Sequence, residues 1–167
     1  LQRFWAEAKR LHPVTVVRDY ERTIINELNL QLEAANATQL RKNWHGSGKL
    51  YVPIIYWDYC RTDVMVMERI YGLSSADVEG LRARGVDMQK LAHLGVEIFF
   101  TQVFEHNFFH ADMHPGNVFI DASQPEEPSY IGLDCAIIGS LTENDKNYLA
   151  RNLLAFFNRD YYEVARL

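Results

Sequence analysis

The sequence predicts an α+β fold in two parts, on three observations. A helical run from about Thr15 to Asn43 precedes two short stretches with strand character. A second apolar run, from Leu91 to Phe109, is long enough for a helix, and the short apolar stretches after it flank a polar, proline-containing connection. A chain of 167 residues has room for one hydrophobic core. We therefore expect a smaller mixed part over residues 1–70 and a mostly helical part over residues 71–167.

The first part begins with the long helix. Glu27 and Asn29 are two residues apart and point in roughly opposite directions on a helix, so either the helix begins or bends near them or Glu27 serves a different surface from Glu33. Ile24, Leu28, Leu32 and Ala35 fall at three- and four-residue intervals, so this spacing predicts one buried face. Residues 51–56 and 63–70 then read as two strands, with the turn between them at 61–63.

The second part begins with a predicted capping box at 74–77, which opens a helix. The run 91–109 is apolar nearly all round and predicts a buried helix. Residues 118–120 and 130–133 predict the two strands of a hairpin. Thr142 is expected to cap a final helix that turns four apolar side chains inward: Leu149, Leu153, Phe156 and Phe157.

The chemistry of the chain is concentrated around this hairpin. His110-Ala-Asp112-Met-His-Pro-Gly-Asn117 places a carboxylate and an amide five residues apart, and Asp134 follows the second strand. Phosphoryl transfer needs a group that orients the nucleophile and oxygen ligands that hold Mg²⁺ against the nucleotide phosphates. The pattern matches the kinase order H-x-D-x-x-x-x-N followed by D-x-x. The sequence therefore predicts a protein-kinase-like fold, with a partial N-lobe before the catalytic loop and a C-lobe around it.

Simpler interpretations exist for each of these residues. An Asp and an Asn at this spacing are common, and Asn before a strand is often a turn residue. His110, Asp112 and His114 could instead bind a transition metal, because imidazole and carboxylate suit Zn²⁺ or Fe²⁺. The other histidines show no paired spacing, which disfavours a metallohydrolase. The joint order of loop, hairpin and acid favours the kinase interpretation.

The second predicted strand leads into a candidate hinge. In a kinase, backbone groups at this position bind the adenine edge, so Met67, Glu68, Arg69 and Ile70 are candidate nucleotide contacts. The alternative is an ordinary edge hairpin.

Composition narrows the function classes. A net charge of −5 without a basic stripe argues against a nucleic-acid partner. Two cysteines without metal spacing indicate no disulfide framework. The sequence contains no run of eighteen uncharged apolar residues, so it predicts no membrane-spanning helix.

Several segments together resemble one family. These are Glu27-Leu-Asn29-Leu-Gln-Leu-Glu33-Ala-Ala, the hinge Met67-Glu-Arg-Ile-Tyr-Gly72, the catalytic loop 108–119 and Tyr130-Ile-Gly-Leu-Asp-Cys135. Over essentially its whole length the chain resembles the UbiB family of atypical kinases, whose bacterial members support ubiquinone biosynthesis.

The resemblance implies roles for individual residues. Glu33 corresponds to the helix-C glutamate that pairs with the nucleotide-binding lysine, and Glu27 to the first acid of an E-x-D element near the phosphates. Asp112 corresponds to the catalytic aspartate, and Asn117 and Asp134 to the Mg²⁺ ligands of an ATP site.

Two positions depart from the family pattern. Asn29 stands where the E-x-D element has its aspartate, so one negative charge is lost. Ala136 stands where the metal-binding triplet usually ends in glycine, and its Cβ restricts positive φ. Both departures weaken the expectation of turnover.

Some family elements are missing from this sequence. It contains no glycine- or alanine-rich phosphate loop, no V-A-x-K strand and no K-x-G-Q element. We therefore expect a fragment that by itself binds nucleotide weakly. The resemblance implies that the full protein sits at the cytoplasmic face of the inner membrane, anchored through regions outside this chain, near ubiquinone-pathway proteins and lipid intermediates.

Three functions follow as hypotheses. The first is an Mg-dependent ATPase that supports ubiquinone biosynthesis. The second is a non-catalytic, nucleotide-sensing scaffold for proteins of that pathway. The third is a small-molecule phosphotransferase, since such enzymes share this catalytic-loop layout.

Overall fold

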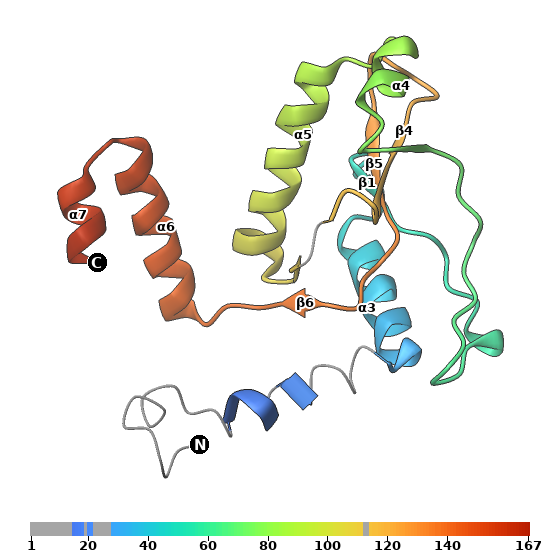
Figure 1. Ribbon diagram of the computed structural model, residues 1–167, viewed down its shortest axis with the longest axis horizontal. Coiled ribbons are helices and arrows are strands. Elements are labelled where there is room, and N and C mark those ends of the chain that lie inside the picture. Colours follow the sequence, from blue (N-terminus) through green and yellow to red (C-terminus); the bar gives the residue numbers. More distant parts are fainter. Residues whose placement is uncertain (1–14, 19, 22–27, 112–113) are drawn as a thin grey trace.

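The computed structural model describes residues 15–18, 20–21, 28–111 and 114–167 and has the predicted α+β architecture (Figure 1). The helices are α3 (Leu30–Asn43), α4 (Val78–Ala83), α5 (Met88–Phe100), the π-helix η2 (Thr101–His106), α6 (Glu143–Phe157), α7 (Tyr161–Arg166) and a 3₁₀ turn, η1 (Trp57–Tyr59). The strands are β1 (Leu50–Tyr51), β2 (Leu73–Ser74), β3 (Phe109–His110), β4 (Val118–Asp121), β5 (Ser129–Gly132) and β6 (Ile138–Gly139).

The predicted hairpin is confirmed and lies at the centre of a four-stranded sheet of order β1-β5-β4-β2. Strands β4 and β5 are antiparallel, with Val118 opposite Gly132 and Asp121 opposite Ser129. Strand β1 adds to β5 in parallel, and β2 adds to β4 antiparallel. A separate pair, β3 and β6, joins the start of the catalytic loop to the segment after Asp134.

The long predicted helix is not continuous to Asn43, which agrees with the alternative of a start or bend near Asn29. Residues 15–18 and 20–21 are helical, but α3 begins only at Leu30. Asn29 has non-helical backbone angles (φ −96°, ψ 90°), and its side-chain oxygen accepts a hydrogen bond from Gln31 N at 3.1 Å. Asn is among the best N-cap residues, which explains the break.

The predicted buried face of this helix is also wrong. Leu28 and Leu32 are 71% and 46% exposed, and Ile24 lies outside the described residues. The buried side chains of α3 are instead those of two alanines and one leucine: Ala34, Ala37 and Leu40. Two alanines on this face allow the helix backbone to approach its neighbours closely.

The two strands predicted at 51–56 and 63–70 pair, but not as regular strands. Tyr56 N donates to Val66 O at 2.9 Å, and Glu68 N donates to Ile54 O at 2.8 Å. An isolated bridge joins Ile55 to Met67, and a second one, between Arg61 and Val64, closes the turn. Pro53 has no backbone N–H to donate, which limits the regular ladder.

Two helix starts follow local rules. The residue that caps α4 is Asp77 itself, whose Oδ1 accepts from Gly80 N at 2.9 Å, so the predicted box beginning at Ser74 is wrong. Helix α6 begins as predicted at Thr142, whose Oγ1 accepts from Asp145 N at 3.2 Å.

The apolar run after Leu91 is not buried all round. It forms α5 and then η2, with Leu91, Ile98 and Val103 buried, whereas Val96 and Phe99 are 57% and 42% exposed. The helix packs against β5, and part of its apolar surface is exposed.

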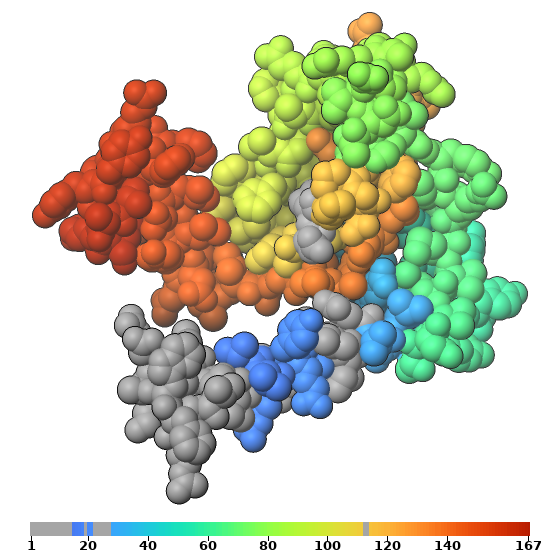
Figure 2. Space-filling model, in the orientation of Figure 1, coloured from blue at the N-terminus to red at the C-terminus, as the bar shows by residue number. Residues whose placement is uncertain are grey.

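The inward face predicted for the last helix is wrong for its two phenylalanines. Phe156 and Phe157 are exposed, while Leu149 and Leu153 are partly buried. Figures 1 and 2 show α6 and α7 as a projection at one side of the molecule, joined to it through β6.

Two apolar clusters hold the sheet to its helices. One joins α3 to α5 through Leu40, Trp44, Val52 and Ile98, and the other joins α4 and α5 to β4 through Leu81, Leu91 and Ile120. Tyr130 of β5 packs against both clusters. No helix within the described part of the chain has the length and apolar character needed to cross a bilayer.

The contact between α5 and β5 gives a stability test. A Cβ on Gly95 would lie 2.8 Å from the Tyr130 hydroxyl oxygen, which donates to Leu91 O at 3.1 Å. We expect Gly95→Ala to lower the free energy of unfolding by about 1–2 kcal/mol, although alanine gains about 1 kcal/mol of helix propensity. In a Tyr130→Phe background the same change should cost nothing or stabilise. Urea unfolding of the four proteins measures this coupling, and simple additivity would contradict the packing described.

Candidate functional site

The hairpin places Asn117 and Asp134 side by side. Asn117 directly precedes β4, and Asp134 follows β5 by two residues. Leu133 N donates to Asn117 O at 3.1 Å, which closes the open end of the hairpin. The Asn117 side-chain amide then donates from Nδ2 to Asp134 Oδ2 at 3.0 Å. The amide oxygen of Asn117 is left as a second oxygen ligand beside the carboxylate.

The backbone around the pair fixes its orientation. Asp134 Oδ1 accepts from Ala136 N at 2.9 Å, so each carboxylate oxygen has one donor. Asn117 N donates to His114 O at 2.9 Å, and His114 Nδ1 accepts from Gly116 N at 3.0 Å, which forms the turn before β4. The concern about Ala136 does not apply, because positive φ among the described non-glycine residues occurs at Asn107 and Arg159.

Helix α3 reaches this site through two side chains one turn apart. Asn36 Nδ2 donates to Cys135 O at 3.0 Å, and Cys135 N donates to Glu33 Oε1 at 3.4 Å. The two side chains therefore hold the backbone of the residue that follows Asp134. The structure brings Glu33, Asn117 and Asp134 together, although they are spread over 101 residues of sequence.

The charges in this cluster are unbalanced. Burial, and secondly the nearby Asp134 carboxylate, raise the pKa of Glu33 above its ordinary value of 4.5, while the bond from Cys135 N opposes them. No cation contributes to this pKa among the described residues. Burial likewise raises the pKa of the Cys135 thiol to about 12, so that the thiol is neutral.

The donor set fits Mg²⁺. A carboxylate and an amide oxygen are hard ligands, and Mg²⁺ in nucleotide sites commonly takes one or two protein ligands, with water and phosphate completing its shell. The described residues contain no group of three or more His, Cys, Asp or Glu side chains that could hold a metal by themselves. Asp112 and Glu27 lie outside the described residues, so the predictions made for them stay predictions.

The catalytic loop is anchored from behind by Gln102, which sequence reasoning missed. Gln102 is 2% exposed and lies in η2, and its Oε1 accepts from His110 N at 3.0 Å. A π-helix at this point is typical of functional sites. Because the same run also carries Glu97, Glu105 and His106, no clear signal in the sequence distinguishes Gln102.

The predicted hinge lies away from this cluster. Glu68, Arg69 and Ile70 line a cavity next to Asp121 and Ser129, at the turn of the hairpin, and Met67 pairs with Ile55. The Glu68 carboxylate accepts from Tyr51 Oη at 2.5 Å and from Ile54 N at 3.1 Å. The bond from Tyr51 is the main cause that lowers the pKa of Glu68, and it raises the pKa of Tyr51.

Comparison with known proteins agrees with this arrangement. Residues 1–167 match the ABC1 atypical kinase-like domain. Curated proteins named "Probable protein kinase UbiB" are 61% identical over 166 residues in Pseudomonas paraeruginosa and 60% identical over 167 residues in Marinobacter nauticus. These matches cover 99% and 100% of this chain, but the chain spans only 31% and 30% of those relatives.

A solved structure shares the fold. It is a Mycobacterium tuberculosis protein in complex with erythromycin, matched with a TM-score of 0.67 and 21% identity over 90% of this chain and 37% of that one. The kinase-like α+β fold predicted from the sequence is therefore confirmed.

The raised pKa of Glu33 predicts a pH-dependent stability difference. In the folded protein a pKa above 4.5 favours the protonated Glu33 carboxyl. The stability that this carboxyl contributes is therefore fully present below pH 4.5 and is lost as the pH rises through the folded-state pKa. Glu33→Gln keeps an oxygen for Cys135 N and removes the charge. We expect its free energy of unfolding to exceed that of the wild type increasingly from pH 4.5 towards neutrality.

Chemical unfolding over this pH range measures the effect, with Glu126→Gln, an exposed loop acid, as the control. A Glu33→Gln difference that is constant with pH would contradict the charge imbalance.

The anchor at Gln102 gives a second test. Gln102→Met keeps the volume but leaves the buried His110 N–H without its acceptor. We expect the free energy of unfolding to fall by about 1–3 kcal/mol. Amide exchange at His110 should also accelerate more than exchange in α3. Gln124→Met, in an exposed loop, is the control, and an unchanged His110 exchange rate would refute the anchoring role.

Proposed function

Because the chain belongs to the ABC1 family of atypical kinase-like proteins, we propose that it forms part of an Mg-ATP site and that its parent protein hydrolyses ATP in support of ubiquinone biosynthesis. The observation that carries this proposal is the pairing of Asn117 with Asp134 at 3.0 Å, with helix α3 docked against the next residue through Glu33 and Asn36. The ubiquinone role rests on the name of the UbiB relatives.

Asn117 and Asp134 would hold the metal. Mg²⁺, when bound, offsets the negative charge of the nucleotide phosphates and orients them. The chain's own contribution is a preset geometry: the bonds from Ala136 N and Asn117 Nδ2 orient the Asp134 carboxylate before any ligand arrives. Preset groups of this kind cost little reorganisation during the reaction.

Glu33 would act as a positioning residue. In this proposal it accepts a cation, which the family resemblance identifies as the nucleotide-binding lysine. The raised pKa of Glu33 supports this role. A cation placed against Glu33 would offset both the cost of burying its negative charge and the repulsion from Asp134. Asp112 would orient the attacking hydroxyl or water, and Glu27 would lie near the phosphates, both as the resemblance implies.

The backbone of residues 67–70 would contact the adenine edge, as expected from the kinase order of elements. The pairing of Glu68 N with Ile54 O and the anchoring of the Glu68 side chain by Tyr51 support a fixed course for this segment. We therefore assign contact with the adenine edge to the backbone groups of Met67, Glu68, Arg69 and Ile70. We assign their side chains no contact with the phosphates.

The test is Mg-dependent ATP binding and phosphate release by the full protein and by Asp134→Asn, which keeps the shape and removes the charge. We expect phosphate release to fall about 100-fold or more and Mg-dependent affinity about tenfold or more. The matched control is Asp121→Asn, an identical change at the other end of the same hairpin, which should leave both quantities unchanged.

The other outcomes separate the alternatives. Binding that depends on Asp134 without phosphate release would favour the nucleotide-sensing scaffold. Phosphate transfer to a small molecule would favour the phosphotransferase. Absence of binding at millimolar nucleotide would overturn the proposal.

A further inference from the structure

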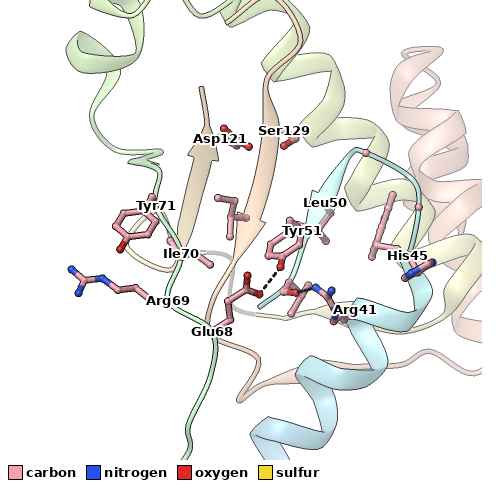
Figure 3. A pocket seen from close by; sticks show the side chains of 15 residues that line it. Arg41, His45, Leu50, Tyr51, Glu68, Arg69, Ile70, Tyr71, Asp121 and Ser129 are labelled. Carbon is pink, nitrogen blue, oxygen red and sulfur yellow. Dashed lines mark hydrogen bonds between the residues drawn. The ribbon is translucent and has the colours of Figure 1, made fainter. Parts of the chain in front are cut away.

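A cavity of about 520 Å³ lies beside the segment 68–71, away from the Asn117–Asp134 pair (Figure 3). Its volume is within the range of about 300–1,000 Å³ typical of small-molecule sites. Its walls come from four places: the end of α3 and the loop after it, strand β1, the segment 68–71, and the turn end of the β4–β5 hairpin.

The cavity lies away from the Asn117–Asp134 pair, although it borders residues 68–70, whose backbone we assign to the adenine edge. Asp121 and Ser129, which pair at the turn of the hairpin, line the cavity, whereas Asn117 and Asp134 lie at its open end. Four strand residues separate the two ends by roughly 13 Å. Glu33, Asn117 and Asp134 are not among the residues that line the cavity.

The acidic groups of the cavity already accept hydrogen bonds from the protein. Glu68 accepts from Tyr51 Oη and Ile54 N, and Asp121 Oδ1 accepts from Ser123 N at 2.9 Å. Two of the acceptor positions of Glu68 and one of Asp121 are occupied in this way, so each carboxylate keeps further acceptor capacity.

The basic groups retain free donors. Arg41 donates from one nitrogen to Val52 O at 2.5 Å, and its guanidinium carbon lies 4.9 Å from the centre of the Tyr51 ring. The Arg41 guanidinium is also close enough to the Tyr51 hydroxyl and the Glu68 carboxylate to interact with both. The guanidinium carbon of Arg69 lies 5.4 Å from the centre of the Tyr71 ring, and Arg69 makes no hydrogen bond or ion pair with any described residue. A guanidinium carries five N–H donors, so the donors open to a ligand belong chiefly to Arg69.

The rest of the lining is apolar or aromatic. Leu50, Ile70 and Ile131 contribute aliphatic surface, and the Tyr51 and Tyr71 rings stand on different walls. Flat rings and guanidinium planes favour a flat ligand, because they can stack on its faces.

We propose that this cavity binds a planar aromatic anion, with the ring against the tyrosine and aliphatic surface and the anionic group on Arg69 and Arg41. The ligand class follows from the Arg69 guanidinium, which has no hydrogen bond or ion pair among the described residues, and from the aromatic and aliphatic walls. The proposed function uses only the backbone of residues 68–70, whereas this ligand is held by side chains, so loss of carboxylate binding in Arg69→Gln and loss of phosphate release in Asp134→Asn are separate outcomes.

The experiment is isothermal titration calorimetry of the full protein with naphthalene-2-carboxylate. The neutral 2-naphthamide serves as the probe of the same shape. Arg69→Gln is the test variant, because the residue is exposed and its guanidinium lies over the Tyr71 ring without a hydrogen bond or ion pair among the described residues. Arg82→Gln, an exposed arginine of α4 outside the cavity, is the charge-matched control.

We expect saturable binding of the carboxylate, weaker binding of the amide by about fivefold or more, and about tenfold weaker carboxylate binding in Arg69→Gln. Arg82→Gln should bind like the wild type. Equal affinity for the two probes or an unchanged Arg69→Gln would each overturn the proposal. Absence of saturable binding up to millimolar probe would overturn it as well.

Discussion

The docking of helix α3 onto the backbone of Cys135 is the constraint on which the site depends. Glu33 and Asn36, one turn apart, bond to the N–H and the C=O of Cys135, so both polar groups of this residue are held by one helix. Asp134 is the preceding residue, and its position is therefore tied to α3. The helix can approach closely because Ala34 and Ala37 form its buried face, and its start is set by the Asn29 cap. A change in how α3 begins or packs would therefore move a proposed metal ligand.

The same cluster carries an electrostatic imbalance that a ligand could relieve. Glu33 and Asp134 bring two carboxylates close together, and burial together with the Asp134 charge raises the pKa of Glu33. Such a pair binds cations more readily than an isolated acid, because a positive charge offsets the repulsion between the two. The predicted catalytic loop has further anchors in Gln102 and the β3–β6 pair, and Ile138 of β6 packs against the apolar cluster that includes Leu40 of α3.

The sequence predicted those elements that depend on residues close together in the chain, such as the β4–β5 hairpin. The hairpin followed from two short apolar stretches around a polar connection, and its register then placed Asn117 beside Asp134. A start or bend near Asn29 was one of two alternatives from the sequence, because apolar periodicity does not mark where a helix begins, and the Asn29 cap decides between them. The exposure of Phe99, Phe156 and Phe157 was missed because periodicity identifies an apolar face but not what covers it. The contact of Gln102 with His110 depends on the π-helix, which has no clear sequence signal.

The most direct measurement is the anomalous X-ray scattering of Mn²⁺ in crystals of the full protein with a non-hydrolysable ATP analogue. The account predicts a peak about 2.1 Å from an Asp134 carboxylate oxygen and from the Asn117 amide oxygen, with the bonds from α3 to Cys135 retained. A peak coordinated elsewhere, with the Asn117–Asp134 hydrogen bond undisturbed and no metal against it, would contradict the account.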